Sequence, residues 1–362
     1  MRRSLIAAVV LALAIASGTL IARGDDDLRS PLAQALATLP DATLTANFTD
    51  WRLVRETVGA PDITSAASTT DRREWLDAAY EDDLSAASAL AGSGPSMSKH
   101  FGWSVFDLDW EVLGQAREGA AIVAELSGAV GPDEVIAGLA DLGYREPESA
   151  ADDGGVWRGG PDLLATIDYS LSPMLQNVAV LADRNLVVLS DLSSYAERTV
   201  DTIVSESDDL AEVRDVAATA APLDRAIAAV VHQPPRSCAV TSFDHASAAD
   251  RQLAAARIAE AGGLGDQRGL GFGIRADDVG LVLDVSLHFE SPAAAEAAQE
   301  PRTALAHGPA IGQGGTYDER FDVESVRVIA DDLVLALRPI GDRMSLVSDL
   351  TSSPLLFSGC GG

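Results

Sequence analysis

The stretch VAVLADRNLVVL, residues 178–189, places Ala-Asp-Arg between two runs of aliphatic, β-prone residues. The same arrangement recurs as GIRADDVGLVLDV at 273–285 and as VRVIADDLVLAL at 326–337. Aspartate adopts the backbone conformations that tight chain reversals require, and the flanking runs are typical of strands. We therefore expect three β-hairpins, in which the aspartates form turns rather than ligate a metal ion.

Helical signals lie between these hairpins and before them. Asp50 is a candidate N-cap for a helix over Trp51–Val58, while Pro132–Leu142 begins with proline and is followed by Gly143. We also expect helices over Asp71–Ala91, Pro222–Val231 and Ala246–Ala261, and a strand over Cys238–Phe243. Hairpins that alternate with helices predict an α+β fold, with an antiparallel sheet built from repeated β-hairpins and covered by helices.

The N-terminal run Leu5–Ala22 is uncharged and apolar, and Arg2 and Arg3 precede it. Its length suits either a short membrane-spanning helix or a long signal peptide. The basic residues favour a cytoplasmic N-terminus over residues 1–4, with the chain beyond the run outside the cytoplasm. The run continues past the small-x-small site Ala14-Ile15-Ala16, which favours a retained signal anchor over cleavage and secretion.

Residues 23–36 form a charged juxtamembrane spacer in this interpretation. The remaining chain is divided at Pro234-Pro235 into two extracytoplasmic α+β halves, 37–233 and 234–362, which either share one core or fold separately. Asp50-Trp51 recurs as Asp109-Trp110, a weak indication of duplicated strand–helix units.

The charge of the chain excludes one class of partner. The formal net charge is −29, and without Arg2, Arg3 and Arg23 the exported part carries about −32, because every acidic residue follows position 24. Such a surface repels phosphate backbones, so we expect no nucleic-acid partner. Hydrophobic residues make up 47% of the chain, which is enough for a sizeable core.

Cys238 and Cys360 are the two cysteines of the chain. In an exported protein a pair is expected to be bridged, and no CxxC motif or histidine-rich neighbourhood indicates a metal site. Closing a loop of roughly 120 residues stabilises by about 4–5 kcal/mol in the loop-entropy model, so the predicted disulfide fastens the C-terminus.

Signals for catalysis are incomplete. Ser96 and Lys99 match the Ser-x-x-Lys pattern of serine acyl enzymes, but Gly94-Pro95 predicts a solvent loop, and Lys99 is the single lysine, so no Lys-Thr-Gly partner exists. The five histidines are dispersed, and the sequence predicts no cofactor, metal or catalytic site. The five tryptophans are expected to anchor the core, the alternative being a ligand groove.

Several stretches carry a family resemblance: Thr49-Asp50-Trp51, the region from Phe101-Gly102-Trp103 to Asp107-Leu108-Asp109-Trp110, and the closing Pro354–Cys360. Together with the export segment they resemble uncharacterised envelope proteins of actinobacteria. The resemblance implies a lipid or membrane anchor, although this chain lacks the lipidated cysteine. It supplies no functional residue.

The function expected from these observations is a non-catalytic, membrane-tethered extracytoplasmic protein that binds an envelope component or a partner protein. Two alternatives stay open. One is a serine acyl-enzyme hydrolase or transferase that uses Ser96 and Lys99. The other is a carrier of an apolar ligand held between sheet and helices.

Overall fold

Antiparallel strands dominate the computed structural model, which describes residues 29–148, 153–206, 208–341, 346–351 and 355–361. Eleven strands of this described part form one sheet. They are β1 Thr45–Asp50, β2 Leu108–Gln115, β3 Ala120–Leu126, β4 Asp153–Arg158, β5 Asn177–Leu181, β6 Leu186–Ser190, β7 Ala228–His232, β8 Gly269–Ala276, β9 Leu281–His288, β10 Phe321–Ile329 and β11 Asp332–Pro339. The predicted α+β class is confirmed.

All three predicted hairpins are present as β5–β6, β8–β9 and β10–β11. The predicted aspartate turn is found in β8–β9, where Asp277 accepts hydrogen bonds from the amides of Val279 and Gly280. In the other two turns the residue with positive φ is Asn185 or Ala330 rather than an aspartate, and Asp332 lies in β11. Short-range turn chemistry therefore sets these pairings.

Helices cover the sheet and connect its strands. They are α1 Pro31–Leu36, α2 Trp51–Val58, α3 Thr69–Glu81, α4 Gly94–His100, α5 Pro132–Leu142, α6 Gly160–Ile167, α7 Ser193–Ser205, α8 Arg214–Ala220, α9 Arg236–Val240, α10 Ala248–Ala261, α11 Pro292–Leu305 and α12 Leu346–Thr351. Asp50 caps α2 by accepting from the amide of Leu53, and Gly143 ends α5 in the left-handed conformation, both as predicted. Gly59 ends α2 in the same way.

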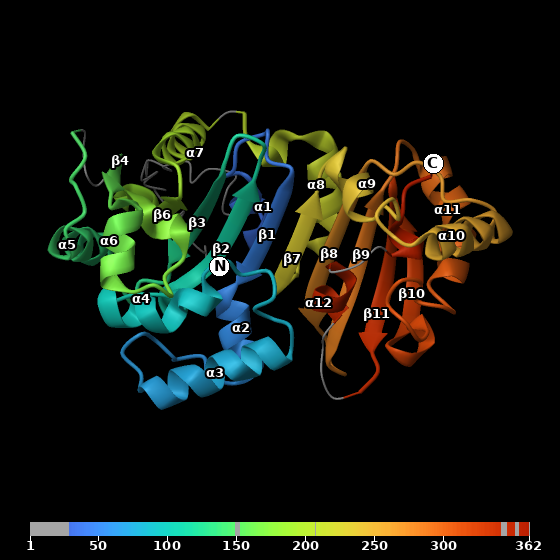
Figure 1. Ribbon diagram of the computed structural model, residues 1–362, viewed down its shortest axis with the longest axis horizontal. Helices are drawn as coiled ribbons and strands as arrows, with labels where there is room; N and C mark the ends of the chain where they lie inside the picture. The colour runs from blue at the N-terminus through green and yellow to red at the C-terminus, as the bar shows by residue number, and fades with distance from the viewer. Residues whose placement is uncertain (1–28, 149–152, 207, 342–345, 352–354, 362) are drawn as a thin grey trace, which may run out of the picture.

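The strand order is β10-β11-β9-β8-β7-β1-β2-β3-β6-β5-β4, with the antiparallel β1–β7 pair in the middle (Figure 1). Outward from β1 the order is β2, β3, β6, β5, and outward from β7 it is β8, β9, β11, β10. The two orders are equivalent. In each half the first three strands follow one another in the sheet, and the later strand of the next hairpin, β6 or β11, pairs with the third strand, β3 or β9. The two halves of the sheet therefore repeat one topology, to which the first half adds β4.

Both faces of the sheet are covered by core. Along β3, Ile122 and Ala124 belong to one buried cluster, while Ala121 and Val123 belong to the other. This alternation follows from the two-residue period of a strand, and it explains why the central strands are apolar on both faces.

Several predictions were wrong at specific segments. Pro222–Val231 is not a helix, because Ala228–His232 forms β7 between β1 and β8. Cys238–Phe243 is not a strand, because α9 covers its first residues. The helix predicted over Asp71–Ala91 is α3, which begins after the N-cap Ser68 and ends at Glu81. Its Tyr80 is 75% exposed, because the buried face is that of Trp75 and Ala79.

The repeated Asp-Trp pair does not mark a duplicated strand–helix unit. Asp50 ends β1 and precedes α2, whereas Trp110 lies within β2, directly opposite Asp50. Among the described residues no helix is long and apolar enough to cross a membrane. The predicted anchor at 5–22 and the residues 1–4 before it lie outside the described part.

Candidate functional site

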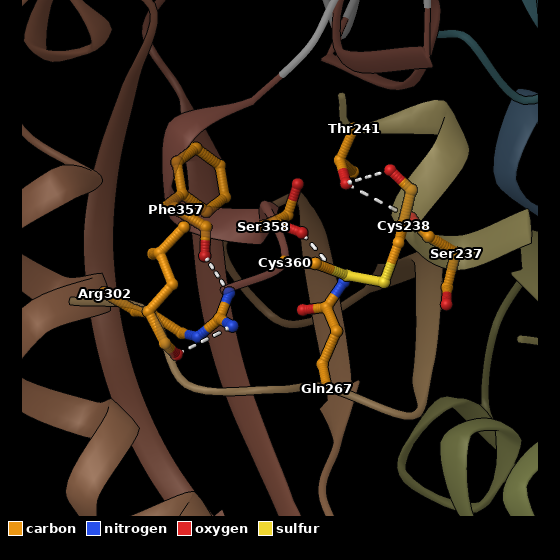
Figure 2. The surroundings of a disulfide bond; sticks show 9 residues. Ser237, Cys238, Thr241, Gln267, Arg302, Phe357, Ser358 and Cys360 are labelled. Carbon is orange, nitrogen blue, oxygen red and sulfur yellow. Dashed lines mark hydrogen bonds between the residues drawn. A yellow bond between two sulfur atoms is a disulfide. The ribbon is translucent and has the colours of Figure 1, made fainter. Parts of the chain in front are cut away.

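A disulfide joins Cys238 of α9 to Cys360 near the C-terminus, as predicted (Figure 2). The two Cα atoms lie 5.3 Å apart. Thr241 closes α9 by donating its hydroxyl to the carbonyl oxygens of Ser237 and Cys238. The disulfide therefore fixes this short helix to residues 355–361, which we name the C-terminal tail.

Arg302 of α11 holds the C-terminal tail through its backbone. Nη1 donates to the carbonyl oxygen of Phe357 at 2.7 Å, and Nη2 donates to that of Leu264 at 3.0 Å (Figure 2). The guanidinium carbon also lies 5.2 Å from the ring centroid of Phe289. Arg302 is 0% exposed, and this burial lowers its pKa to about 9. The tail carbonyl thus solvates a buried cation that water cannot reach.

Two further contacts complete the attachment of the tail. Gln267 Nε2 donates to the carbonyl oxygen of Ser358 at 2.9 Å. The Phe357 ring packs edge-on against Tyr317, with centroids 5.4 Å apart, and Phe321 stacks on Tyr317. Of these residues sequence reasoning singled out only the tail and its cysteine. Arg302 lies in an alanine-rich helix after Pro301, where nothing local distinguishes it from a surface arginine.

A cavity of about 550 Å³ lies against the disulfide, between α9, α10 and the C-terminal tail. We name it the disulfide cavity. Its apolar lining comes from Phe243, Ile258, Leu264 and Leu356, and Asp244 and Arg251 also line it. The disulfide itself forms part of the wall.

The helix over the cavity, α10, buries little of its surface. Of the 14 residues of α10, Ala254 is the buried one, and Leu253 is 45% exposed. The N-cap Ser247 and the left-handed Gly262 define the helix locally, so its formation does not depend on tight packing against the sheet. Because α10 has few buried contacts, little free energy is needed to move it locally away from the sheet. This property suits a helix that covers a binding site.

Ser96 is hydrogen-bonded to Ser170 and Asp168 rather than to Lys99 in the described part of the chain. The stretch is helix α4 rather than the predicted loop, so the two residues do lie one turn apart. Ser96 Oγ, however, is 2.7 Å from Ser170 Oγ and donates to Asp168 Oδ2 at 3.1 Å. Lys99 is exposed, and within the described part of the chain no hydrogen bond joins it to Ser96.

The five tryptophans are core residues, all between 0% and 4% exposed. Trp51 contributes a polar contact as well, since its Nε1 donates to Glu111 Oε2 at 3.0 Å. The other carboxyl oxygen of Glu111 accepts from the amide of Ala89 at 2.8 Å. Burial raises the pKa of Glu111, and these donors oppose that shift. The carboxylate fastens α2 and the segment around Ala89 to β2.

Among the residues that the structure describes, no group of three or more His, Cys, Asp or Glu side chains is placed to hold a metal ion. No protein-family model matches the chain, and no curated protein matches its sequence.

Solved structures similar to this chain include crystal form III of TP0453, with 9% identity and a TM-score of 0.41 over 88% of this chain and 98% of that one. Crystal form I of TP0453 gives 9% identity and a TM-score of 0.40 over 89% and 98%. At these values the similarity assigns neither a family nor a function.

Proposed function

We propose that this chain is a non-catalytic extracytoplasmic protein, tethered to the membrane through residues 5–22, that binds an apolar group of an envelope component in the disulfide cavity. The observation that carries the proposal is the cavity itself: about 550 Å³ of space with an apolar lining, beneath a helix that buries only Ala254. Binding sites for small apolar ligands have this character.

The compartment is supported by the disulfide. Both cysteines of the chain are used in one bridge between residues 122 positions apart. Such structural disulfides persist in oxidising compartments outside the cytoplasm. The topology predicted from Arg2, Arg3 and the apolar run places the same domain there.

The driving force for binding comes from burial of apolar surface. A ligand chain that loses about 200 Å² of accessible surface gains about 5 kcal/mol at about 25 cal/mol per Å², before the cost of immobilisation. Ile258 and Leu264 supply aliphatic contacts and Phe243 an aromatic one. Asp244 and Arg251 add polar groups that could meet the hydrated end of an amphiphile.

Native mass spectrometry of the full chain, purified gently from its own envelope and then incubated with decanol, tests the proposal. We expect a bound mass that is lost on denaturation, and one-to-one uptake of decanol by the emptied protein. Ile258→Trp obstructs the cavity with a larger side chain and should abolish both. Leu253→Trp, on the exposed side of the same helix, is the matched control and should change neither.

Two results would overturn the proposal. One is a wild-type chain that never carries or takes up an apolar molecule. The other is an Ile258→Trp protein that unfolds at the wild-type temperature and still binds decanol, because the ligand would then lie elsewhere.

A further inference from the structure

Polar side chains converge on one point of the sheet where its two halves meet. Thr45 of β1 lies directly opposite Gln115 of β2 on one side and His232 of β7 on the other. A second cavity of about 200 Å³ lies at this point. We name it the sheet-centre cavity, and its walls include Asn47, Gln115, His232, Arg236, Thr241 and Phe272.

Helix α9 forms one wall of this cavity. Arg236 begins the helix and Thr241 follows its end, so both positions are set by the disulfide at Cys238. The sheet-centre cavity and the disulfide cavity are distinct, although both touch Thr241. The covalent bridge therefore lies two residues from Arg236, whose side chain lines the sheet-centre cavity.

Several hydrogen-bonding groups of the cavity wall have no partner among the described residues. Nδ1 of His232 is 3.0 Å from Thr45 Oγ1, which uses one ring nitrogen. Within the described part of the chain, no hydrogen bond reaches Nε2 of His232, the side-chain amides of Asn47 and Gln115, or the guanidinium of Arg236. His232 is buried and Asn47 is half-buried, whereas Gln115 and Arg236 are exposed. Polar side chains from four elements therefore converge on one cavity that a ligand can reach from solvent, which points to a polar ligand.

The charge of the cavity selects the ligand class. None of the described residues that line it is acidic, although acidic residues outnumber basic ones by 55 to 26 in the chain. Burial, and then the charge of Arg236, lower the pKa of His232 to about 4. At neutral pH the cavity therefore offers one guanidinium cation, a neutral imidazole and two amides.

We propose that the sheet-centre cavity binds a small carboxylate, paired with Arg236 and hydrogen-bonded by the neighbouring amides, whose short apolar body packs on Val230 and Phe272. The volume equals the space of about seven water molecules at about 30 Å³ each, which suits an aliphatic acid of about five carbons. An arginine is suited to this pairing because its planar donors match a carboxylate. This site is independent of the disulfide cavity and of its apolar ligand.

Isothermal titration calorimetry of the full chain with valerate tests the proposal, with uncharged valeramide as the isosteric comparison. We expect saturable one-to-one binding of valerate and at least tenfold weaker binding of valeramide. Arg236→Gln should weaken valerate binding by about tenfold or more, because it removes the charge-assisted pair. Arg73→Gln makes the same charge change at an exposed position of α3 and should leave the affinity unchanged.

A second variant tests whether a loss of binding comes from the cavity rather than from unfolding of the protein. Asn47→Leu keeps the strand position but removes an amide and reduces the space, so it should weaken valerate binding while Ile258→Trp does not. The proposal is overturned if valerate shows no saturable binding, if valeramide binds equally well, or if Arg236→Gln binds valerate with wild-type affinity.

Discussion

In the two halves of the sheet, the segment that links the first strand to the second is held in place by different interactions. Residues 51–107 link β1 to β2 and pack Trp51 against Trp75 and Trp75 against Phe106, with centroid distances of 5.7 and 5.3 Å. Residues 233–268 link β7 to β8 at the equivalent place, where Phe243 is the single aromatic ring.

The first connection is fixed by aromatic burial and by the buried carboxylate of Glu111, whereas the second is fixed by the disulfide of Cys238. Closely packed aromatic rings fill the space between a connection and the sheet, so no cavity is left there. A covalent bridge holds a connection without filling the space below it. Both cavities described above accordingly touch α9.

The largest effect is expected at the aromatic connection. Trp51→Ala removes a side chain that is 0% exposed and takes the indole donor from Oε2 of the buried Glu111, so the free energy of unfolding should fall by about 3–5 kcal/mol. Denaturant unfolding followed by far-UV circular dichroism measures it. Leu253→Ala on the loosely packed α10 is the comparison and should cost less than about 0.5 kcal/mol. Equal losses would show that the two connections are fixed alike.

Removal of the disulfide should cause the second-largest loss in the free energy of unfolding. The Cys238→Ser, Cys360→Ser double variant is expected to lose about 2–5 kcal/mol, and reduction of the wild type should reproduce the loss. All five tryptophans lie between positions 51 and 157, so their fluorescence reports on the first half.

We expect faster hydrogen exchange in α9 and the C-terminal tail of the double variant under native conditions, with unchanged tryptophan emission. A red-shifted emission in the folded double variant would mean that the first half depends on the disulfide as well.

A smaller effect concerns His232, where the two halves meet. Its pKa is about 4 when folded and 6.5 in the unfolded chain, so the unfolded state binds more protons between these values. The stability present above pH 6.5 should therefore fall by up to about 3 kcal/mol as the pH drops to about 4.

His232→Gln keeps a partner for Thr45 but cannot be protonated, so it should flatten this part of the pH profile. Thermal unfolding from pH 4 to 7 measures the slope. His245→Gln, at an exposed position, should retain the wild-type slope. An identical slope in the His232 and His245 variants would contradict the assignment.

The smallest effect is expected at Ser96. Ser96→Ala should change stability by less than about 0.5 kcal/mol, because Ser96 lies at the edge of α4 with Ser170 and Asp168. Neither the wild type nor the variant should react with a fluorophosphonate probe. Labelling that is present in the wild type and lost in Ser96→Ala would establish the serine acyl-enzyme alternative.

Two errors of sequence-based prediction lie in the second connection and beside it. Ala228–His232 follows a proline and an alanine-rich run, which locally favours a helix, yet pairing with β1 and β8 makes it the strand at the centre of the sheet. Cys238–Phe243 contains β-prone residues, yet it pairs with no strand of the described sheet, and its first residues belong to α9. In both places partners distant in the chain override local preference.

The sequence by itself determined the α+β class, the three hairpins, the capped helices α2 and α5, and the pairing of its two cysteines. These features depend on turn conformations, on caps within a few residues, and on there being one possible disulfide. The tertiary structure alone decided the strand order, the burial of Arg302 beside the tail, and the convergence of Thr45, Gln115 and His232 at the sheet centre. The physical reason is separation along the chain, because these contacts join residues from 55 to 187 positions apart, and no local pattern encodes them.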